Sequence, residues 1–414
     1  MAILGALYWV FPEKSSSEEM TALRTDSAII EDTELAMIDT IALSDSVSSA
    51  IEETRKEVAA RPVIPSVPLD STTDSRVFLQ SFYASLSECG EHVVRVLHYG
   101  DSQIEEDRMT QQIRDALQKR YGGSGVGLMP LAQTIPSRSV SQQLFMNGKQ
   151  VQASQGPRRY MVYAPKRDQR KDGLYGVMGQ MAVMSDSVVT GSEDIMAVCT
   201  PLDGKRRYTR WQLLADSTIH YSFAGDTVRL SGRGHVYGLS QESDTGVIVD
   251  NLPMRGCLGL VFTKMDSTQL ATFYREQHVR LIILQFGGNA IPFNETPSTI
   301  NAIVRGLRNQ VRYLRRLAPE ASFLFIGPSD MLTQIDGVPQ TYPMVPYMDR
   351  MLQKMAMEEE IAYFSLFRFM GGAGSMVRWQ EQGLAGADGI HFMRSGARKA
   401  GKGVAEWMIE GIKN

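Results

Sequence analysis

Four short, mostly apolar segments limit the folds open to this chain. Each is bounded by Gly, Pro or Asp, as is typical of strands buried on both faces of a parallel sheet. They are VVRVLHY (93–99), RLIILQF (280–286), SFLFIG (322–327) and IAYFSL (361–366). Segments with helical spacing of apolar residues separate them, at 107–122, 298–318 and 342–360. This alternation predicts an α/β fold, a three-layer α/β/α sandwich around a mainly parallel, flavodoxin-like sheet.

The middle of the chain breaks this alternation. Residues 135–251 are rich in Gly, Ser and Thr and contain short alternating runs such as STIHYSF, DTVRLSG and TGVIVDN, with no convincing helix. Such runs predict an antiparallel β module. We therefore expect one α/β domain, formed by residues 74–134 and 252–414, that is interrupted by an inserted β module over 135–251.

The first 73 residues have a different composition. An apolar run over 2–11 is shorter than the roughly 20 residues that cross a bilayer, and it lacks a basic start and a cleavage site. This run is either the remnant of an export signal or membrane anchor, or a local apolar segment that associates non-specifically. Residues 11–60 contain twelve acidic against four basic residues and predict a disordered stalk, which a proline-rich linker follows at 61–74.

Charge and cysteine content exclude several kinds of partner. The net charge of −3 gives no reason to expect nucleic acid as a partner. Cys89, Cys199 and Cys257 form no C-x-x-C pair and are too scattered to predict a zinc site. We expect neither a metal nor an organic cofactor.

Polar residues follow the predicted strands where ligands bind in open α/β sheets, beyond the carboxyl ends. Ser102 comes after the first strand and Asn289 after the second, while Ser329-Asp330 follows the third. Asp388 and His391 are three residues apart, just before the last predicted helix. These segments are expected to meet at one rim of the sheet.

The residue types at this rim suit acyl transfer. A serine hydroxyl becomes nucleophilic when a base removes its proton, and imidazole is the base best suited to neutral pH. A carboxylate on the other ring nitrogen fixes the imidazole tautomer. We therefore predict Ser102 as nucleophile, His391 as base and Asp388 as its partner. The plainer alternatives are a helix cap at Ser102 and a simple turn at Asn289.

The same blocks resemble the SGNH (GDSL-type) hydrolase family over about residues 74–130 and 252–414. The matching blocks are Gly100-Asp101-Ser102, Gly287-Gly288-Asn289 and Asp388-x-x-His391. The resemblance implies an oxyanion hole formed by the Ser102 N–H, the Gly256 N–H and Asn289. Gly259 and the segment 122–127 are the alternatives to Gly256. Ala290 departs from the family, which often has an acidic residue there.

The extended GDSQIEEDRMT segment and the insertion look like the exported branch that includes peptidoglycan O-acetylesterases, in which a carbohydrate-binding-like β module interrupts the hydrolase domain. The resemblance implies an ester hydrolase that deacetylates an extracytoplasmic glycan, with a periplasmic or cell-envelope location. An O-acetyltransferase using the same acyl-enzyme and a non-catalytic glycan-binding protein remain alternatives. The sugar, the ester position, the acyl length and the oligomeric state stay open.

Other residues have structural interpretations. His98 is expected to be a core histidine, and His92 and His278 surface residues, while His220 and His235 fall in the insertion. The basic, aromatic stretches 158–171 and 204–211 are interpreted as solvated faces, with anionic glycan binding as the alternative. Glu105, Glu106 and Asp107 are expected to complement the first turn of the following helix.

Overall fold

The computed structural model describes residues 74–131, 136–151, 195–202, 208–215, 219–232, 236–265, 267–335 and 337–412. The predictions for residues 1–73, for His235 and for the basic stretch 158–171 lie outside these ranges. Within them, no helix is both long and apolar enough to cross a membrane.

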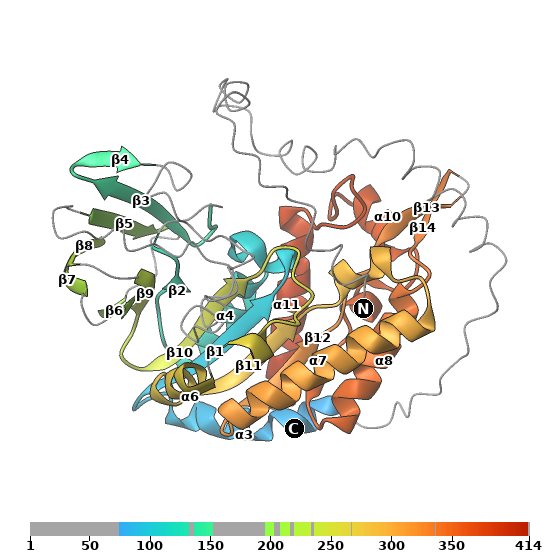
Figure 1. The fold of residues 1–414 in the computed structure, drawn as a ribbon, viewed down its shortest axis with the longest axis horizontal. Helices are drawn as coiled ribbons and strands as arrows, with labels where there is room; N and C mark the ends of the chain where they lie inside the picture. The colour runs from blue at the N-terminus through green and yellow to red at the C-terminus, as the bar shows by residue number, and fades with distance from the viewer. Residues whose placement is uncertain are drawn as a thin grey trace. The chain divides into compact units, whose positions relative to one another are not determined.

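A five-stranded, wholly parallel sheet forms the centre of the α/β domain (Figure 1). In spatial order its strands are β10 (Gly246–Pro253), β1 (Val93–Gly100), β11 (Val279–Gln285), β12 (Ser322–Ile326) and β15 (Ala362–Phe364). Along the chain this order reads 2-1-3-4-5, which is the flavodoxin-like arrangement. The predicted fold class and the four predicted strands are confirmed.

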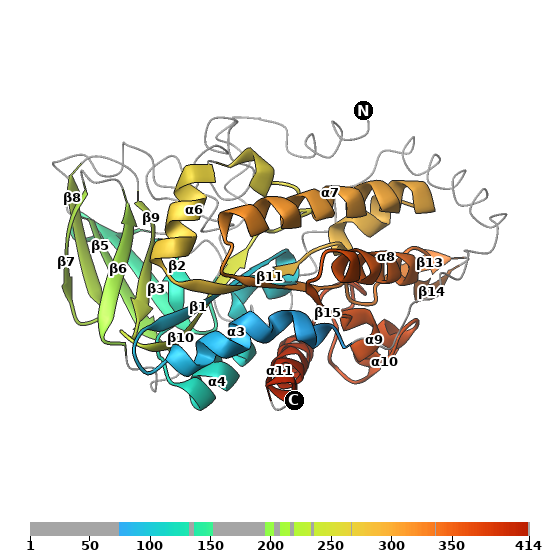
Figure 2. The same ribbon diagram turned by 90° about the horizontal axis from the view of Figure 1, so that it is seen from below.

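Helices cover both faces of this sheet, and Figure 2 shows the two helical layers above and below it. One face packs against α6 (Ser267–Glu276), α7 (Pro297–Leu317) and α8 (Val345–Glu358). The other packs against α3 (Gln80–Ser85), α4 (Thr110–Tyr121), α9 (Leu366–Met370), α10 (Ser375–Glu381) and α11 (Arg394–Gly411).

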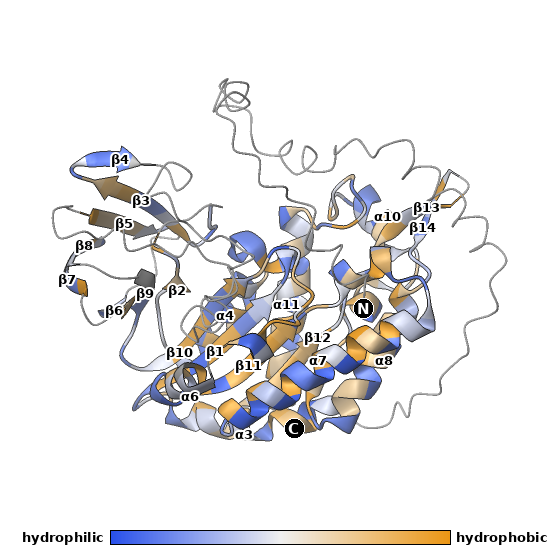
Figure 3. Ribbon diagram, viewed as in Figure 1, coloured by the Kyte–Doolittle hydropathy of each residue, from blue (hydrophilic) through white to orange (hydrophobic). Residues whose placement is uncertain are grey.

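Helix α7 shows why the sequence forms this layer. Thr296 closes a capping box at its start and Pro297 occupies its first turn. Its buried residues recur at helical spacing, from Ile300 through Val304 and Leu307. The helix therefore has one apolar side against the sheet and one polar side, which are visible as alternating colours in Figure 3.

The insertion consists of two antiparallel sheets that share a small core. One contains β2 (Gly127–Met129), β9 (Val236–Glu242) and β6 (Arg210–Ala215). The other contains β4 (Lys149–Val151), β3 (Val140–Met146), β5 (Ile195–Pro201), β8 (Thr227–Gly232) and β7 (Ile219–Ala224). An inserted antiparallel module was predicted and is present.

One boundary of the module differs from the prediction. The segment TGVIVDN was assigned to the module, but β10 pairs in parallel with β1 along its whole length and belongs to the main sheet. Its run Gly246–Asp250 is buried, as in a central strand, because both α4 and β2 pack against β10. At the other boundary, β2 lies before residue 135 but pairs with β9 of the module.

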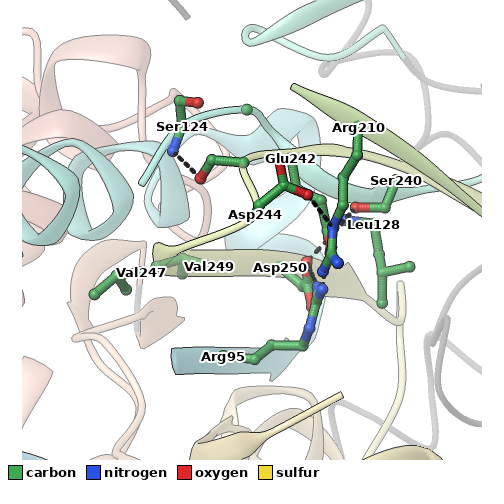
Figure 4. A network of polar contacts seen from close by, with 12 residues as sticks. Arg95, Ser124, Leu128, Arg210, Ser240, Glu242, Asp244, Val247, Val249 and Asp250 are labelled. Atoms are coloured by element: carbon green, nitrogen blue, oxygen red, sulfur yellow. Dashed lines mark hydrogen bonds and ion pairs between the residues drawn. The ribbon is translucent and has the colours of Figure 1, made fainter. Parts of the chain in front are cut away.

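A buried ion network joins the module to the main sheet (Figure 4). Arg95 of β1 donates to both carboxylate oxygens of Asp250, at 3.0 and 2.9 Å, and to Glu242 of β9 at 2.5 Å. All three side chains are fully buried. Glu242 also accepts from Arg210 of β6, and Asp250 from the Leu128 N–H of β2. The module is thus attached through charge pairs as well as apolar contacts.

Candidate active site

Ser102 lies just past the carboxyl end of β1, at the start of the 3-10 segment η5 (Ser102–Asp107). The cap of this segment is Asp101, whose Oδ1 accepts from the Gln103 N–H at 3.0 Å. The Ser102 hydroxyl instead lies 3.0 Å from His391 Nε2. The helix-cap interpretation of Ser102 therefore does not describe this structure.

His391 contacts a carboxylate through its other ring nitrogen. Its Nδ1 is 2.7 Å from Asp388 Oδ2, and the Asp388 Oδ1 accepts from the N–H groups of Ile390 and His391 at 2.9 and 3.0 Å. Since a carboxylate only accepts, Nδ1 carries the proton and the Nε2 lone pair faces Ser102. The three side chains form one continuous hydrogen-bonded chain.

The charge of Asp388 follows from these contacts. Burial acts to raise its pKa, but the hydrogen bonds from His391 and from the two backbone N–H groups outweigh it, so the pKa lies below its ordinary value. Asp388 is therefore ionised near neutral pH. An ionised carboxylate at Nδ1 stabilises the imidazolium that forms when Nε2 takes a proton.

Sheet topology brings the other predicted residues to the same place. Strands β1 and β11 are neighbours at the switch point of the sheet, where crossovers diverge to opposite sides and a crevice opens. Asn289 lies in the 3-10 segment η8 (Gly288–Phe293), directly after β11. Its Nδ2 is 3.3 Å from Asp101 Oδ2 and 3.3 Å from the Cys257 carbonyl. These two acceptors orient the amide, with one contact to the nucleophile segment and the other to the turn after β10.

Gly256 lies in a turn, after β10, that contacts both the end of β1 and Asn289. The turn starts where the Met254 N–H donates to the Gly100 carbonyl at 2.7 Å, and it closes with a Cys257 N–H to Met254 carbonyl bond of 3.0 Å. Gly256 has a φ of +66°, a left-handed conformation that favours glycine. The turn is thus held at one end by Gly100, two residues before Ser102, and at the other end by Asn289.

The alternative glycines have packing roles. At Gly259, a Cβ would meet the Phe286 ring at 2.7 Å, so this residue allows a close approach within the core. In the segment 122–127, Gly123 lies against the backbone of Val247 and Gly125 against that of Gln241. Both contacts belong to the junction with the β module.

A pocket opens beside Ser102, between the carboxyl ends of β1, β11 and β12. Its walls combine polar groups with apolar side chains and small residues. They include Ser102, Asn289, Gly288, Phe286, Pro328, Met331 and Ile390. Ser329 lines the pocket, whereas Asp330 is fully buried and accepts from Ser375 and the Met376 N–H, so its role is structural.

Asp101 is an unusual carboxyl in this site. It is 5% exposed, and burial raises its pKa to about 6, although the hydrogen bond from the Gln103 N–H opposes the shift. Its two oxygens contact Gln103 and Asn289. Asp101 thus joins the nucleophile segment to the candidate oxyanion amide.

The site also contains contacts that the sequence did not predict. Gln103 donates to the Ile390 carbonyl at 2.7 Å, and Arg108 donates to the carbonyls of Phe392 and Ser102 at 3.2 and 3.1 Å. These bonds hold the segment that carries Ser102 against the segment that carries His391. Nothing in their local sequence marks such long-range partners.

The acidic run after Ser102 has a different role from the predicted one. Helix α4 begins only at Thr110, and Glu105, Glu106 and Asp107 each form an ion pair with an arginine. Glu106 and Asp107 have φ values of 59° and 63°, left-handed conformations that cost about 1 to 2 kcal/mol each. The acids therefore hold a strained loop and do not complement a helix dipole.

The other four histidines that the structure describes take no part in the hydrogen-bonded chain of Ser102, His391 and Asp388. His98 is fully buried and contacts Gln285 and Thr110, and burial lowers its pKa to about 3, as expected of a core histidine. His278 and His220 are exposed, and His92 is partly exposed beside Glu88. Of the stretch 204–211, Tyr208 to Trp211 are described, and Arg210 pairs with Glu242.

Within the described ranges, no group of three or more His, Cys, Asp or Glu side chains is placed to hold a metal ion. Cys89, Cys199 and Cys257 are buried free thiols.

Neither protein-family models nor curated proteins match the chain. Among solved structures, a peptidoglycan O-acetylesterase superposes with a TM-score of 0.62 at 21% identity, over 82% of this chain and 99% of its own. An alignment of that extent includes the inserted strands as well as the α/β domain. An acetyl xylan esterase matches 40% of this chain and 80% of its own, with a TM-score of 0.27 at 12% identity. A putative GDSL-like lipase from Parabacteroides merdae ATCC 43184 matches 40% of this chain and 73% of its own, with a TM-score of 0.30 at 13% identity. This chain therefore shares its fold, including strands of the insertion, with a peptidoglycan O-acetylesterase.

Proposed function

We propose that the chain is a serine-dependent ester hydrolase that removes O-acetyl groups from an extracytoplasmic polysaccharide such as peptidoglycan. The observation that carries the proposal is the hydrogen-bonded chain from Ser102 through His391 to Asp388. It stands at the switch point of the sheet, next to a pocket, where a substrate would bind.

In the first half-reaction, Ser102 Oγ attacks the acetyl carbonyl carbon while its proton passes to His391 Nε2. Asp388 stabilises the imidazolium. The N–H groups of Ser102 and Gly256 and the Asn289 amide bind the oxyanion of the tetrahedral intermediate. For this, Asn289 gives up one of its 3.3 Å contacts, which are long enough to be exchanged at small cost.

The intermediate then collapses. The bond between the carbonyl carbon and the sugar oxygen breaks, the sugar oxygen takes the proton from His391, and acetyl-Ser102 remains. In the second half-reaction His391 removes a proton from water, which attacks the acyl-enzyme. Acetate leaves and Ser102 recovers its proton. The chemistry uses only groups of this chain and water.

The polysaccharide substrate and the extracytoplasmic location rest on the likeness to the peptidoglycan O-acetylesterase and on the matching inserted module. The non-catalytic alternative gains no support from a serine, imidazole and carboxylate placed in hydrogen-bond contact.

The test uses the full chain with 4-nitrophenyl acetate and with O-acetylated peptidoglycan. Ser102→Ala should lower turnover of both substrates by on the order of 10⁴-fold, because the variant lacks the hydroxyl that forms the acyl-enzyme. Ser395→Ala is the matched control, since Ser395 lies on α11 with its hydroxyl bonded to the Gly383 carbonyl.

Product analysis separates the two chemistries. Free acetate in the presence of a glycan acceptor supports the hydrolase, while acetylated acceptor would identify a transferase. Undiminished activity of Ser102→Ala would remove the proposed mechanism altogether.

A further inference from the structure

Three consecutive acids after the nucleophile each bind an arginine from a different part of the chain. Glu105 pairs with Arg255, which lies in the turn after β10. Glu106 pairs with Arg138, just before β3 of the module. Asp107 pairs with Arg114 of α4, at 2.5 and 3.1 Å. The segment that carries Ser102 is therefore held from three sides.

The pair between Glu105 and Arg255 has the strongest geometry for a positioning role. It is bidentate, with Arg255 Nε 2.7 Å from Glu105 Oε1 and Nη2 2.7 Å from Oε2. The Glu105 side chain is 3% exposed, so the pair is shielded from water on that side. A bidentate pair of this kind fixes both distance and orientation between the two backbone segments.

We propose that the Arg255–Glu105 pair is a positioning device that sets the Gly256 N–H relative to Ser102 and thereby acts on the turnover rate. This inference rests on the proposed function, and it assigns to Arg255 a role in aligning the oxyanion hole. Arg255 is a positioning residue because it acts through the adjacent backbone.

The covalent structure supports this role. The Gly256 nitrogen belongs to the planar peptide group that joins it to Arg255, so movement of the Arg255 backbone carries the Gly256 N–H with it. The turn is anchored at Met254, by Gly100, and at Cys257, by Asn289. Between these anchors, the side chain of Arg255 provides a third attachment. It binds Glu105, which belongs to the same segment as Ser102.

The chain offers a matched control for the chemistry of the pair. Arg312 of α7 and Glu359, just after α8, also form a bidentate pair, at 2.9 and 2.7 Å. The exposures of the arginine and glutamate side chains are 54% and 6%, against 41% and 3% for Arg255 and Glu105. Arg312→Gln therefore measures what loss of a similar ion pair does away from the site.

The experiment compares kcat and KM of wild type, Arg255→Gln, Arg255→Lys and Arg312→Gln on 4-nitrophenyl acetate. We expect Arg255→Gln to lower kcat by about 10- to 100-fold, with KM within about two-fold, because misalignment of the oxyanion donors affects the transition state most. Arg255→Lys should recover part of the loss, since it keeps the charge but not the bidentate geometry. Arg312→Gln should keep the wild-type kcat.

A second pair of variants separates positioning from folding, because Arg255→Gln leaves Glu105 buried without a partner. The double variant Glu105→Gln/Arg255→Gln removes both charges. We expect it, and Glu105→Gln alone, to show the same fall in kcat as Arg255→Gln, since the residues act as one unit. Losses that multiply in the double variant would overturn the proposal.

The outcomes also separate this inference from the function on which it rests. Activity that survives Ser102→Ala removes the hydrolase mechanism. Equal kcat values for Arg255→Gln and Arg312→Gln, in an enzyme that Ser102→Ala inactivates, remove only the positioning role.

Discussion

Strand β1 contributes one residue to a buried polar cluster and leads directly into a second cluster, which is partly exposed to water. Arg95, within the strand, is fully buried with Asp250 and Glu242 at the junction with the β module. Ser102, just past the end of the strand, shares the rim of the sheet with His391 and Asp388, whose side chains are 26% and 13% exposed.

The difference indicates what each cluster can do. Charges that are fully withdrawn from water must be neutralised by one another, so the loss of one member leaves the others uncompensated. Groups at a rim keep access to solvent and to substrate, so their removal changes chemistry more than folding. Mutations in the two clusters should therefore separate activity from stability.

The largest effect is expected at the rim, from His391→Asn. Without a base, the activity should fall by on the order of 10⁴-fold, which corresponds to about 5.5 kcal/mol of transition-state stabilisation. The melting temperature should change little, because the His391 side chain is partly exposed. Ester hydrolysis assays measure the activity, and thermal melting of the same sample measures the melting temperature. His92→Asn, on a partly exposed histidine, is the control, and a His391→Asn variant with more than a tenth of the wild-type activity would contradict the separation.

The second effect is expected at the buried junction. Arg95→Met removes the cation shared by Asp250 and Glu242 and should lower the free energy of unfolding by about 3 to 5 kcal/mol. Urea denaturation at pH 7 measures this loss, and the kcat of the folded fraction should stay near that of wild type.

Arg210→Gln is the control within the same network. The Arg210 side chain is 37% exposed and Glu242 would still pair with Arg95, so the loss should stay below about 1 kcal/mol. If the two substitutions prove equally costly, burial does not distinguish the members of the cluster.

The smallest effect concerns Asp101, which lies at the rim but is buried like the junction. Its pKa of about 6 exceeds the value of 3.8 for an exposed carboxyl, so between these values the folded state binds more protons than the unfolded state. The stabilising contribution is complete below pH 4 and is lost as the pH rises through 6. Asp101→Asn removes this dependence. Relative to that variant, the wild type should lose about 1 to 3 kcal/mol between pH 4 and pH 7.

Urea midpoints of both proteins across this range provide the measurement. Parallel curves for wild type and Asp101→Asn would show that Asp101 titrates alike in the folded and unfolded states.

The sequence predicted the parts that depend on local pattern. Apolar runs identified β1, β11, β12 and β15, and the polar residues after them included Ser102 and Asn289. Strand β10 was assigned to the module because its short run resembles the alternating runs before it, and its parallel partner β1 lies more than a hundred residues away in the chain. Pairing across that distance leaves no local signal.

Local sequence patterns also did not predict the buried ion pairs, because most of the partners lie far apart in the chain. Arg95 is a lone cation within an apolar run, and its partners come from β9 and β10. Glu105 to Asp107 look like a favourable helix start, yet their partners come from three separate segments. A sequence shows which residues carry charge, but only the fold decides what faces them.

The hydrogen bond between Ser102 and His391 spans 289 positions of the chain. During synthesis the serine therefore emerges from the ribosome well before the imidazole. Until His391 has been added and has reached the rim, the nascent polypeptide holds a serine without the imidazole that would activate it. The pairing also depends on the packing of α11, the helix that follows His391, against α4, the helix that follows the Ser102 segment.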